Sequence, residues 1–335
     1  MKRDHAWSGR KMSGRCRINY INLFLESVAM AVSNNEDFPE SLYSTYKPLL
    51  FSLAYRMLGS VMDAEDIVHE SFLALRKTGW EHIGNIRAYL CKIVTNRCLD
   101  HLRSSANKRE LYPGPWLPEP LVGEAGSVGE ENDPLQSYVH KESLATAYML
   151  LLQQLSYVER AVFLLREALQ YDYDEIADIV GKSSVNCRQI YHRAKRSLGS
   201  RASAAAEGSP PASAASAAPA RLVEQFVRAL ANADVDQLMN TLTADATLMM
   251  DSGGKVLAPP SAVVGSRRIA TFLALLPAKF PPLDYRLTEV NGQPGIVVRT
   301  QGQTIAVTSF RMENGRIADV YVVVNPDKLR HVPVT

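Results

Sequence analysis

A run of basic side chains without acidic neighbours is the feature of this sequence with the clearest chemistry. The stretch EIADIVGKSSVNCRQIYHRAKRSL covers Glu175 to Leu198, and no acidic residue lies between Asp178 and Glu207. The basic residues in that interval are Lys182, Arg188, Arg193, Lys195, Arg196 and Arg201. Lysine and arginine neutralise phosphates, and arginine, asparagine and glutamine hydrogen-bond base edges. The stretch therefore favours nucleic-acid binding over the simpler alternative, a solvated basic helix face.

A helix-turn-helix would hold these side chains in place. Gly181 can end a first helix in the left-handed conformation, and Ser183 or Ser184 can cap the next helix. The apolar positions of that second helix share one face and are expected in the core: Cys187, Ile190, Ala194 and Leu198. The polar positions that then face outward are Asn186, Arg188, Gln189, Arg193 and Arg196. Tyr191 and His192 are expected to flank this face or to pack.

Catalytic or metal chemistry finds little support in the residue pattern. Histidine is the usual proton-transfer residue near neutral pH, and none occurs between His192 and His331. Asp251 and Lys255 flank two glycines of a tight turn, which favours a structural ion pair between them. The four cysteines lack the C-x-x-C spacing of a zinc or redox site, so buried thiols are expected. We therefore expect no catalytic residue, no metal site and no cofactor.

Composition and hydropathy bound the class of protein. The chain has 335 residues, 46% apolar and 21% charged, with a formal net charge of +2. This balance is that of a soluble globular protein and excludes a uniformly basic coat for nucleic acid. No apolar run approaches the roughly 20 residues that span a bilayer, so no membrane partner is expected. Residues 1–37 hold basic residues and an apolar run broken by Glu26, which favours a poorly ordered extension over a secretory leader.

Two changes in composition divide the chain. Residues 112–134 are rich in proline, glycine and acids, and residues 201–220 in alanine, serine and proline, so both are expected to be linkers. The predicted boundaries are 38–110 and 139–200 for two helical domains, 111–138 and 201–218 for linkers, and 219–335 for a third domain.

The first helical domain shows clear helix boundaries. One helix is expected to end at Gly59, and Asp63 is expected to cap the next. Glu65 and Asp66 would then lie in the first turn, where the helix dipole favours acids. A third helix is expected to begin near Asn85.

The third domain has a different pattern. Two short helices and a helix near residues 267–276 precede strand-like runs at 285–290, 294–300, 304–312 and 316–324. The runs are separated by NGQ, QGQ and ENG, which are typical of tight hairpin turns. We expect an α+β domain with helices packed against an antiparallel sheet.

Two segments and three short motifs together resemble a known family. Residues 42–75 and 85–104, followed by a linker and the helix-turn-helix, resemble the extracytoplasmic-function sigma factors of bacterial RNA polymerase. WLPEP (116–120), DSGGK (251–255) and NPDKL (325–329) resemble the subgroup with a fused SnoaL-like C-terminal domain. DSGGK departs from the D-G-G-G-K of that subgroup at Ser252. The implied fold is two all-α sigma domains, a helical bundle and a helix-turn-helix, before an α+β cone-shaped SnoaL-like domain.

The resemblance implies roles for the first helical domain. It implies that acidic residues dock on the coiled coil of the polymerase β′ subunit: Asp63, Glu65, Asp66 and Glu70. It also implies that the melted −10 strand is held by Trp80, Asn85, Asn96, Arg97, Asp100 and Arg103, four of which match an N-R-x-x-D-x-x-R pattern. Simpler alternatives stay open. The first-turn acids can serve the helix dipole, Asp100 and Arg103 can form a surface ion pair, and Trp80 can be a core residue.

For the rest of the chain, the resemblance implies duplex binding and regulation. The residues implied for −35 DNA are Ser184, Asn186, Arg188, Gln189, Arg193, Lys195 and Arg196. The residues implied for regulatory contact between domains are Trp116, Leu117, Pro118, Asp251, Lys255, Asn325, Pro326, Asp327 and Lys328. Ordinary turn and strand-end structure is the alternative for this second set.

The resulting expectation is a cytoplasmic, non-enzymatic sigma factor. It would bind core polymerase and promoter DNA, and its SnoaL-like domain would modulate it in cis. The alternative is a helix-turn-helix regulator that senses a small ligand and does not depend on core polymerase. A tethered enzyme is a third, weaker possibility.

Overall fold

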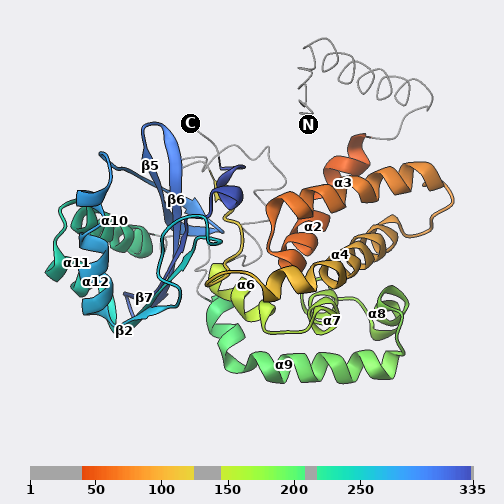
Figure 1. The fold of residues 1–335 in the computed structure, drawn as a ribbon. Helices are drawn as coiled ribbons and strands as arrows, with labels where there is room; N and C mark the ends of the chain where they lie inside the picture. The colour runs from red at the N-terminus through yellow and green to blue at the C-terminus, as the bar shows by residue number, and fades with distance from the viewer. Residues whose placement is uncertain (1–39, 124–144, 208–216, 333–335) are drawn as a thin grey trace, which may run out of the picture. The chain divides into compact units, whose positions relative to one another are not determined.

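The computed structural model describes residues 40–123, 145–207 and 217–332 (Figure 1). The predicted extension, residues 1–37, lies outside the described residues, as do residues 124–138 and 208–216 of the two predicted linkers and residues 139–144 of the predicted second helical domain. Contacts divide the chain into Met1–Tyr43 and Ser44–Thr335, and the contacts described below all lie within the second unit.

The N-terminal helical part consists of α2 (Glu40–Leu58), α3 (Val61–Thr78) and α4 (Ile86–Glu110). Gly59 ends α2 with φ of 71°, as predicted. The prediction that Asp63 caps α3 is wrong, because α3 begins earlier and Ser60 is its N-cap. The Ser60 hydroxyl accepts a hydrogen bond from the Asp63 backbone N at 3.2 Å, which leaves Asp63 in the first turn. Asn85 caps α4 through the Ala88 backbone N (3.0 Å), close to the predicted start.

The second helical part consists of α6 (Thr146–Gln153), α7 (Tyr157–Glu167), α8 (Tyr173–Val180) and α9 (Ser184–Glu207). Helices α8 and α9 form the predicted helix-turn-helix, with Gly181 left-handed at φ 66° and Ser183 bonding the backbone N of Asn186 (3.3 Å). The backbone bends at Gly199 and then stays helical to Glu207. The expectation of an unfolded segment from residue 201 is therefore wrong for 201–207, because alanine strongly favours helix.

The C-terminal part packs helices against one mixed sheet. Its helices are α10 (Ala217–Ala231), α11 (Val235–Thr241) and α12 (Ser266–Ala274), with a 3₁₀ turn η1 (Pro277–Lys279). Its strands are β2 (Leu242–Asp251), β3 (Val263–Val264), β4 (Asp284–Val290), β5 (Gln293–Thr300), β6 (Gln303–Glu313) and β7 (Arg316–Val323). A second 3₁₀ turn, η2 (Pro326–Leu329), follows β7.

The strand order is β1-β4-β5-β6-β7-β2-β3, where β1 (Val122–Gly123) comes from the linker. Strands β4 to β7 form the predicted hairpins, and the turn residues Asn291, Gln301 and Asn314 all have positive φ. The expectation of a wholly antiparallel sheet is wrong at one place: β2 and β7 pair in parallel. No turn joins β2 directly to β7, because α12 and strands β3 to β6 lie between them in the sequence, so no hairpin fixes their relative direction.

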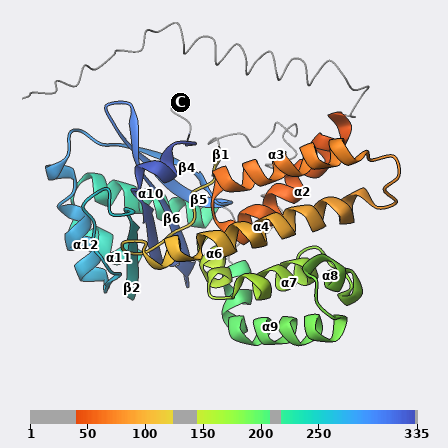
Figure 2. The ribbon, with the colours of Figure 1, turned by 45° about the vertical axis from the view of Figure 1, so that its right-hand side comes forward.

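Each face of the sheet has its own apolar layer. Helices α10 to α12 cover one face (Figure 2). In that layer Phe226 meets the Phe310 ring edge-on at 5.2 Å. On the other face, Leu117 of the linker and Leu329 of η2 join β-strand valines, and Leu150 of α6 packs against them. Segments of the linker, the second helical part and the C-terminal part thus meet on this second face.

Candidate nucleic-acid interface and linker clip

The outward face of α9 carries the predicted duplex contacts. The residues that line an open hollow along it are Arg188, Gln189, His192, Arg193 and Arg196. All five are exposed, whereas the predicted core positions of α9 are at most 6% exposed, so the predicted orientation of the helix is confirmed. The face can take up phosphates and base edges together.

Two aromatic rings of the second helical part hold cations of α9. The Tyr173 ring lies 5.1 Å from the Arg188 guanidinium and 4.9 Å from that of Arg166. The buried Tyr191 hydroxyl donates to Glu167 and accepts from the Lys195 ammonium at 3.1 Å. This bond and the Glu167 charge raise the pKa of Lys195. The rings therefore hold the Arg188 and Lys195 side chains in place.

The acids of α3 share a surface with residues of α4. Asp66 and Glu70 are exposed, and the Glu70 carboxylate forms an ion pair with Arg97. Asp63 lies 3.5 Å from His101. The residues that line the hollow between the two helices are Asp63, Asp66, Ile67, Glu70, Arg97, Asp100 and His101. Residues expected to bind polymerase and residues expected to bind the −10 strand are thus brought together.

The other predicted −10 residues are spread along the α3–α4 loop and α4. Trp80 is partly exposed in the loop, which does not support the alternative of a core residue. The Asn85 side-chain oxygen caps α4, so its amide nitrogen is the group left for other contacts. Arg103 bonds Asp100 at 2.9 Å, as the alternative of a surface ion pair requires, and its guanidinium lies 5.8 Å from the Tyr157 ring.

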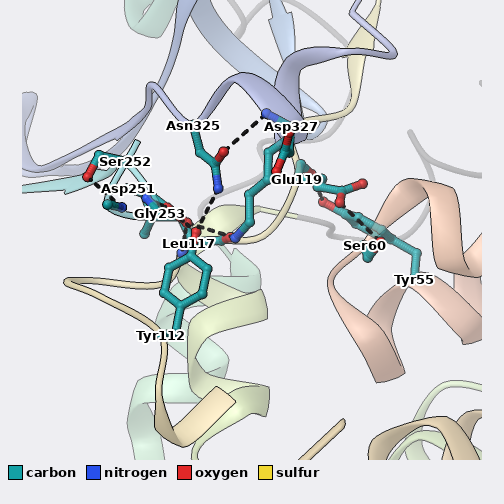
Figure 3. A network of polar contacts seen from close by, with 12 residues as sticks. Tyr55, Ser60, Tyr112, Leu117, Glu119, Asp251, Ser252, Gly253, Asn325 and Asp327 are labelled. Carbon is teal, nitrogen blue, oxygen red and sulfur yellow. Dashed lines mark hydrogen bonds and ion pairs between the residues drawn. The ribbon is translucent and has the colours of Figure 1, made fainter. Parts of the chain in front are cut away.

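The linker is gripped by the C-terminal part at Leu117, as Figure 3 shows. The Leu117 backbone N donates to Asp251 Oδ2 at 2.8 Å, and its carbonyl accepts from Lys328 Nζ at 2.5 Å. Lys328 Nζ also lies 2.7 Å from Asp251 Oδ2, and Leu117 and Asp251 are fully buried. We call residues 112–121 the linker clip.

The predicted ion pair between Asp251 and Lys255 is wrong. Asp251 pairs with Lys328, and Lys255 pairs instead with the exposed Asp327. Gly253 and Gly254 turn the chain with φ of 56° and 71°, and the Asp251 carboxylate also accepts from the Gly253 backbone N at 3.1 Å. Because Asp251 lies at the end of β2 beneath the clip, its carboxylate points inward and the Lys255 ammonium does not reach it.

Aromatic residues of the clip complete this buried network. The Tyr112 hydroxyl donates to Asp251 Oδ1 at 2.5 Å and accepts from Asn325 Nδ2 at 2.9 Å. Burial, and then the Asp251 hydrogen bond, raise the pKa of Tyr112 well above its usual value. The Lys328 ammonium lies 4.3 Å from the Trp116 ring and 5.0 Å from the Tyr112 ring. The ammonium is therefore surrounded by a carboxylate, a carbonyl and two rings.

Two residues further on, the N-terminal helical part grips the clip at Glu119. The Glu119 carboxylate accepts from the backbone N of Val61 at 2.7 Å and from the Ser60 hydroxyl at 3.1 Å, so it caps α3 (Figure 3). The Glu119 carbonyl accepts from the Tyr55 hydroxyl at 2.7 Å, and its backbone N donates to the Gly59 carbonyl at 2.9 Å. Leu117 and Glu119 thus bind different parts of the protein.

Further bonds tie the three parts together. Asn291, in the β4–β5 turn, donates to the Tyr55 hydroxyl at 2.7 Å and exchanges backbone and side-chain bonds with Leu121. The Arg160 guanidinium, only 3% exposed, donates to the Met57 carbonyl of α2 and to the Leu152 carbonyl of α6. Arg160 therefore joins the last turns of two helices, where their dipoles favour a cation.

Several of these residues are absent from the predicted site: Tyr55, Ser60, Tyr112, Glu119, Arg160 and Asn291. Glu119 lies inside the WLPEP motif and Tyr112 just before it, so the motif could have indicated them. The other four look like ordinary helix and turn residues in the sequence.

The described ranges show neither a metal site nor a membrane span. No group of three or more possible metal-ligating side chains occurs in them, and none of their helices is both long and apolar enough to cross a bilayer. Cys91, Cys98 and Cys187 are buried free thiols, as predicted, and Cys16 lies outside the described residues.

Comparison with known proteins agrees with this arrangement. Family models match sigma-70 region 2 over residues 42–108, sigma-70 region 4 over 145–198 and a SnoaL-like domain over 223–329. The chain is 30% identical over 308 residues to the ECF RNA polymerase sigma factor SigJ of Mycobacterium tuberculosis, covering 88% of this chain and 94% of that protein. It is 32% identical over 272 residues to SigG of the same species, covering 74% and 70%.

A solved structure shows the same fold over nearly the whole length. The crystal structure of the M. tuberculosis extracytoplasmic function sigma factor SigJ aligns with a TM-score of 0.69 and 28% identity, covering 89% of this chain and all of that one. The predicted resemblance and fold class are thereby confirmed. The chain belongs to the ECF RNA polymerase sigma factors, and it joins sigma-70 regions 2 and 4 to a C-terminal SnoaL-like domain.

Proposed function

We propose that this sigma factor binds core RNA polymerase, recognises −35 and −10 promoter elements, and is restrained by its own C-terminal part. It carries out no catalysis in this role, and it works in the cytoplasm, where polymerase and chromosome meet. The observation that carries the proposal is the two-sided grip on the linker clip. The C-terminal part holds Leu117, and the N-terminal helical part holds Glu119.

Helix α3 offers a surface suited to the β′ coiled coil. Met62 and Leu73 are 47% and 43% exposed, and with Asp66 and His69 they follow the spacing of one helix face. Exposed apolar residues combined with charged residues are the pattern by which helices pair and select partners. Asp63, Glu65, Asp66 and Glu70 would supply the charge. The Glu70–Arg97 ion pair would then link this docking to the −10 face of α4.

Promoter DNA would be bound at two places. The outward face of α9 would enter the −35 major groove, and its cations would hold flanking phosphates. Trp80, in the exposed loop before α4, would stack on an unpaired −10 base, while Arg97 and Arg103 would hold the strand.

The contact between the two helical parts has to open for both elements to be bound together. The numbers −35 and −10 place the two elements about 25 base pairs apart. At about 3.4 Å per base pair, this is roughly 85 Å of duplex. Small helical domains in contact have centres only about 30 Å apart. Arg160 of α7 bonds the Met57 carbonyl of α2, and α6 packs on the sheet that holds the clip. The proposal therefore requires both contacts to break when the clip is released.

Initiation from a −35/−10 promoter selected with this protein and core polymerase tests the proposal. The full-length chain is compared with versions that end at Gly199 and just before Asn325. The version that ends before Asn325 lacks the Lys328 grip on Leu117, so it should initiate several-fold more transcripts. Equal numbers of transcripts from the full-length chain and from the version that ends before Asn325 would contradict restraint in cis. Failure of every version to bind core polymerase or to initiate would contradict the role in transcription initiation.

A ligand-sensing regulator that is independent of core polymerase is the less favoured reading. Two separate sigma-70 regions match in order, and region 2 has no part to play in such a regulator. Specific DNA binding without core polymerase at physiological salt would favour that regulator instead.

A further inference from the structure

Val185 occupies the first turn of α9 and is 69% exposed. Between Ser184 and Leu198 it is the only large apolar side chain that the structure leaves exposed, because the other apolar residues of that stretch are buried. A branched side chain is also a weaker helix former than the straight polar ones. Neither packing nor local helix stability accounts for a valine here.

The spacing places Val185 at the start of the row that lines the α9 hollow. Going along the helix, that row continues at i+3, i+4, i+7, i+8 and i+11 with Arg188, Gln189, His192, Arg193 and Arg196. One apolar group therefore begins a row of cations and an amide. The charge of this row suits DNA and disfavours an apolar protein partner.

The first turns of a recognition helix are the ones whose side chains reach base edges. Most groups on the major-groove edge are hydrogen-bond donors or acceptors, which an alkyl side chain cannot satisfy. The C5-methyl group of thymine is the exception, and apolar side chains contact it. The guanidinium of Arg188, one helical turn after Val185, lies 5.1 Å from the Tyr173 ring. This contact fixes the position of the Arg188 side chain next to Val185.

We infer that Val185 packs against the C5-methyl group of one thymine in the −35 element and so selects thymine at that position. The inference rests on the proposed function of α9. Covering one methyl-sized group contributes about 0.8 kcal/mol, which corresponds to about a fourfold change in affinity. The remaining contacts of the row would be unaffected.

The test replaces each thymine of the −35 element in turn with deoxyuridine, which lacks only the methyl group. Affinity of the full-length chain with core polymerase is measured on each duplex by fluorescence anisotropy. At one position, replacing thymine with deoxyuridine should lower the affinity of the natural chain about fourfold. Val185→Ala should bind the thymine duplex about fourfold more weakly and should no longer distinguish the two bases there. Val256→Ala, which trims an exposed valine of the C-terminal part, serves as the matched control and should retain the discrimination.

The outcomes separate this assignment from the function on which it rests. Equal affinity for every deoxyuridine duplex, an element without thymine, or unchanged discrimination by Val185→Ala would each overturn the role of Val185 while initiation persists. Arg188→Ala should weaken binding on all these duplexes alike, which shows that α9 is on the DNA. If the natural chain fails to initiate from the unmodified promoter, both the proposed function and this assignment are overturned.

Discussion

The buried pair of Lys328 and Asp251 is the chemical centre of the linker clip. Lys328 is 7% exposed and Asp251 is fully buried, so both charges have left water. Such a pair adds little net stability, because desolvation offsets most of the attraction. Its geometry nevertheless fixes both backbone groups of Leu117, so the pair specifies where the linker lies.

Lys328→Met should be strongly destabilising, because it leaves the Asp251 carboxylate buried without its cation. We expect a loss of about 3–5 kcal/mol in the free energy of unfolding, measured by denaturant titration. Lys255→Met is the matched control: it removes a lysine from an exposed pair with Asp327 and should cost less than about 1 kcal/mol. Adding Asp251→Asn to Lys328→Met should recover part of the loss. Similar losses for the two lysine variants would contradict a buried charge at Asp251.

The end of α2 shows how a helix boundary can also be an interface. Gly59 has φ of 71°, and a Cβ at this position would overlap the Trp116 ring of the clip. Gly79 ends α3 with φ of 82°, but nothing lies within 4 Å of its Cβ position. Two helix-ending glycines with positive φ thus differ in whether the linker is packed on them.

Gly59→Ala should therefore cost more than backbone strain alone. In a Trp116→Ala background we expect the cost of Gly59→Ala to fall by about 1–3 kcal/mol, because the overlap is gone. The cost of Gly79→Ala should be the same in both backgrounds within about 0.5 kcal/mol. Thermal unfolding of the natural chain, the three single variants and the two double variants measures both differences. Additive effects of Gly59→Ala and Trp116→Ala would show that the ring does not rest on Gly59.

How far the sequence predicts this structure depends on how local each signal is. The turn at Gly181 and the buried row that starts at Cys187 follow from neighbouring residues, and both were predictable. Ser60 and Asp63 are both good caps and lie three residues apart, so the sequence alone does not show which of them caps α3. The parallel pairing of β2 with β7 depends on residues some 70 positions apart, and no local pattern encodes it.

The clip was predictable in outline but not in its pairing. The motifs indicated Leu117, Asp251 and Lys328, yet a pattern of spacing could not choose between Lys255 and Lys328 as the partner of Asp251. Arg160 looks like any surface arginine of an amphipathic helix. Its burial arises only in the folded protein, where it bonds carbonyls at the last turns of α2 and α6.

Energy transfer between labels on α4 and α9 can measure how far apart the two helical parts lie before and after the protein binds core polymerase and promoter. In a Cys16→Ser background, fluorophores at Lys92→Cys on α4 and Ser197→Cys on α9 occupy exposed sites, while the three described cysteines are buried. Energy transfer should be high in the free protein and should fall on binding core polymerase and promoter, because the two elements lie roughly 85 Å apart.

A control pair at Lys77→Cys and Lys92→Cys, both in the N-terminal helical part, should keep its transfer unchanged. An initiating complex in which the α4–α9 transfer stays high would contradict the proposed opening.

The ribosome synthesises the helix-turn-helix well before Lys328, the lysine that bonds the linker clip, and this order matters for a newly made chain. Lys328 follows Leu198, the last buried residue of the helix-turn-helix, by 130 residues. At about 5–20 residues per second, the ribosome needs on the order of ten seconds to cover that interval. During that time both helical parts are complete, while the lysine that bonds Leu117 does not yet exist. Under the proposed restraint in cis, each molecule would therefore begin its life unrestrained and become restrained only as its synthesis proceeds.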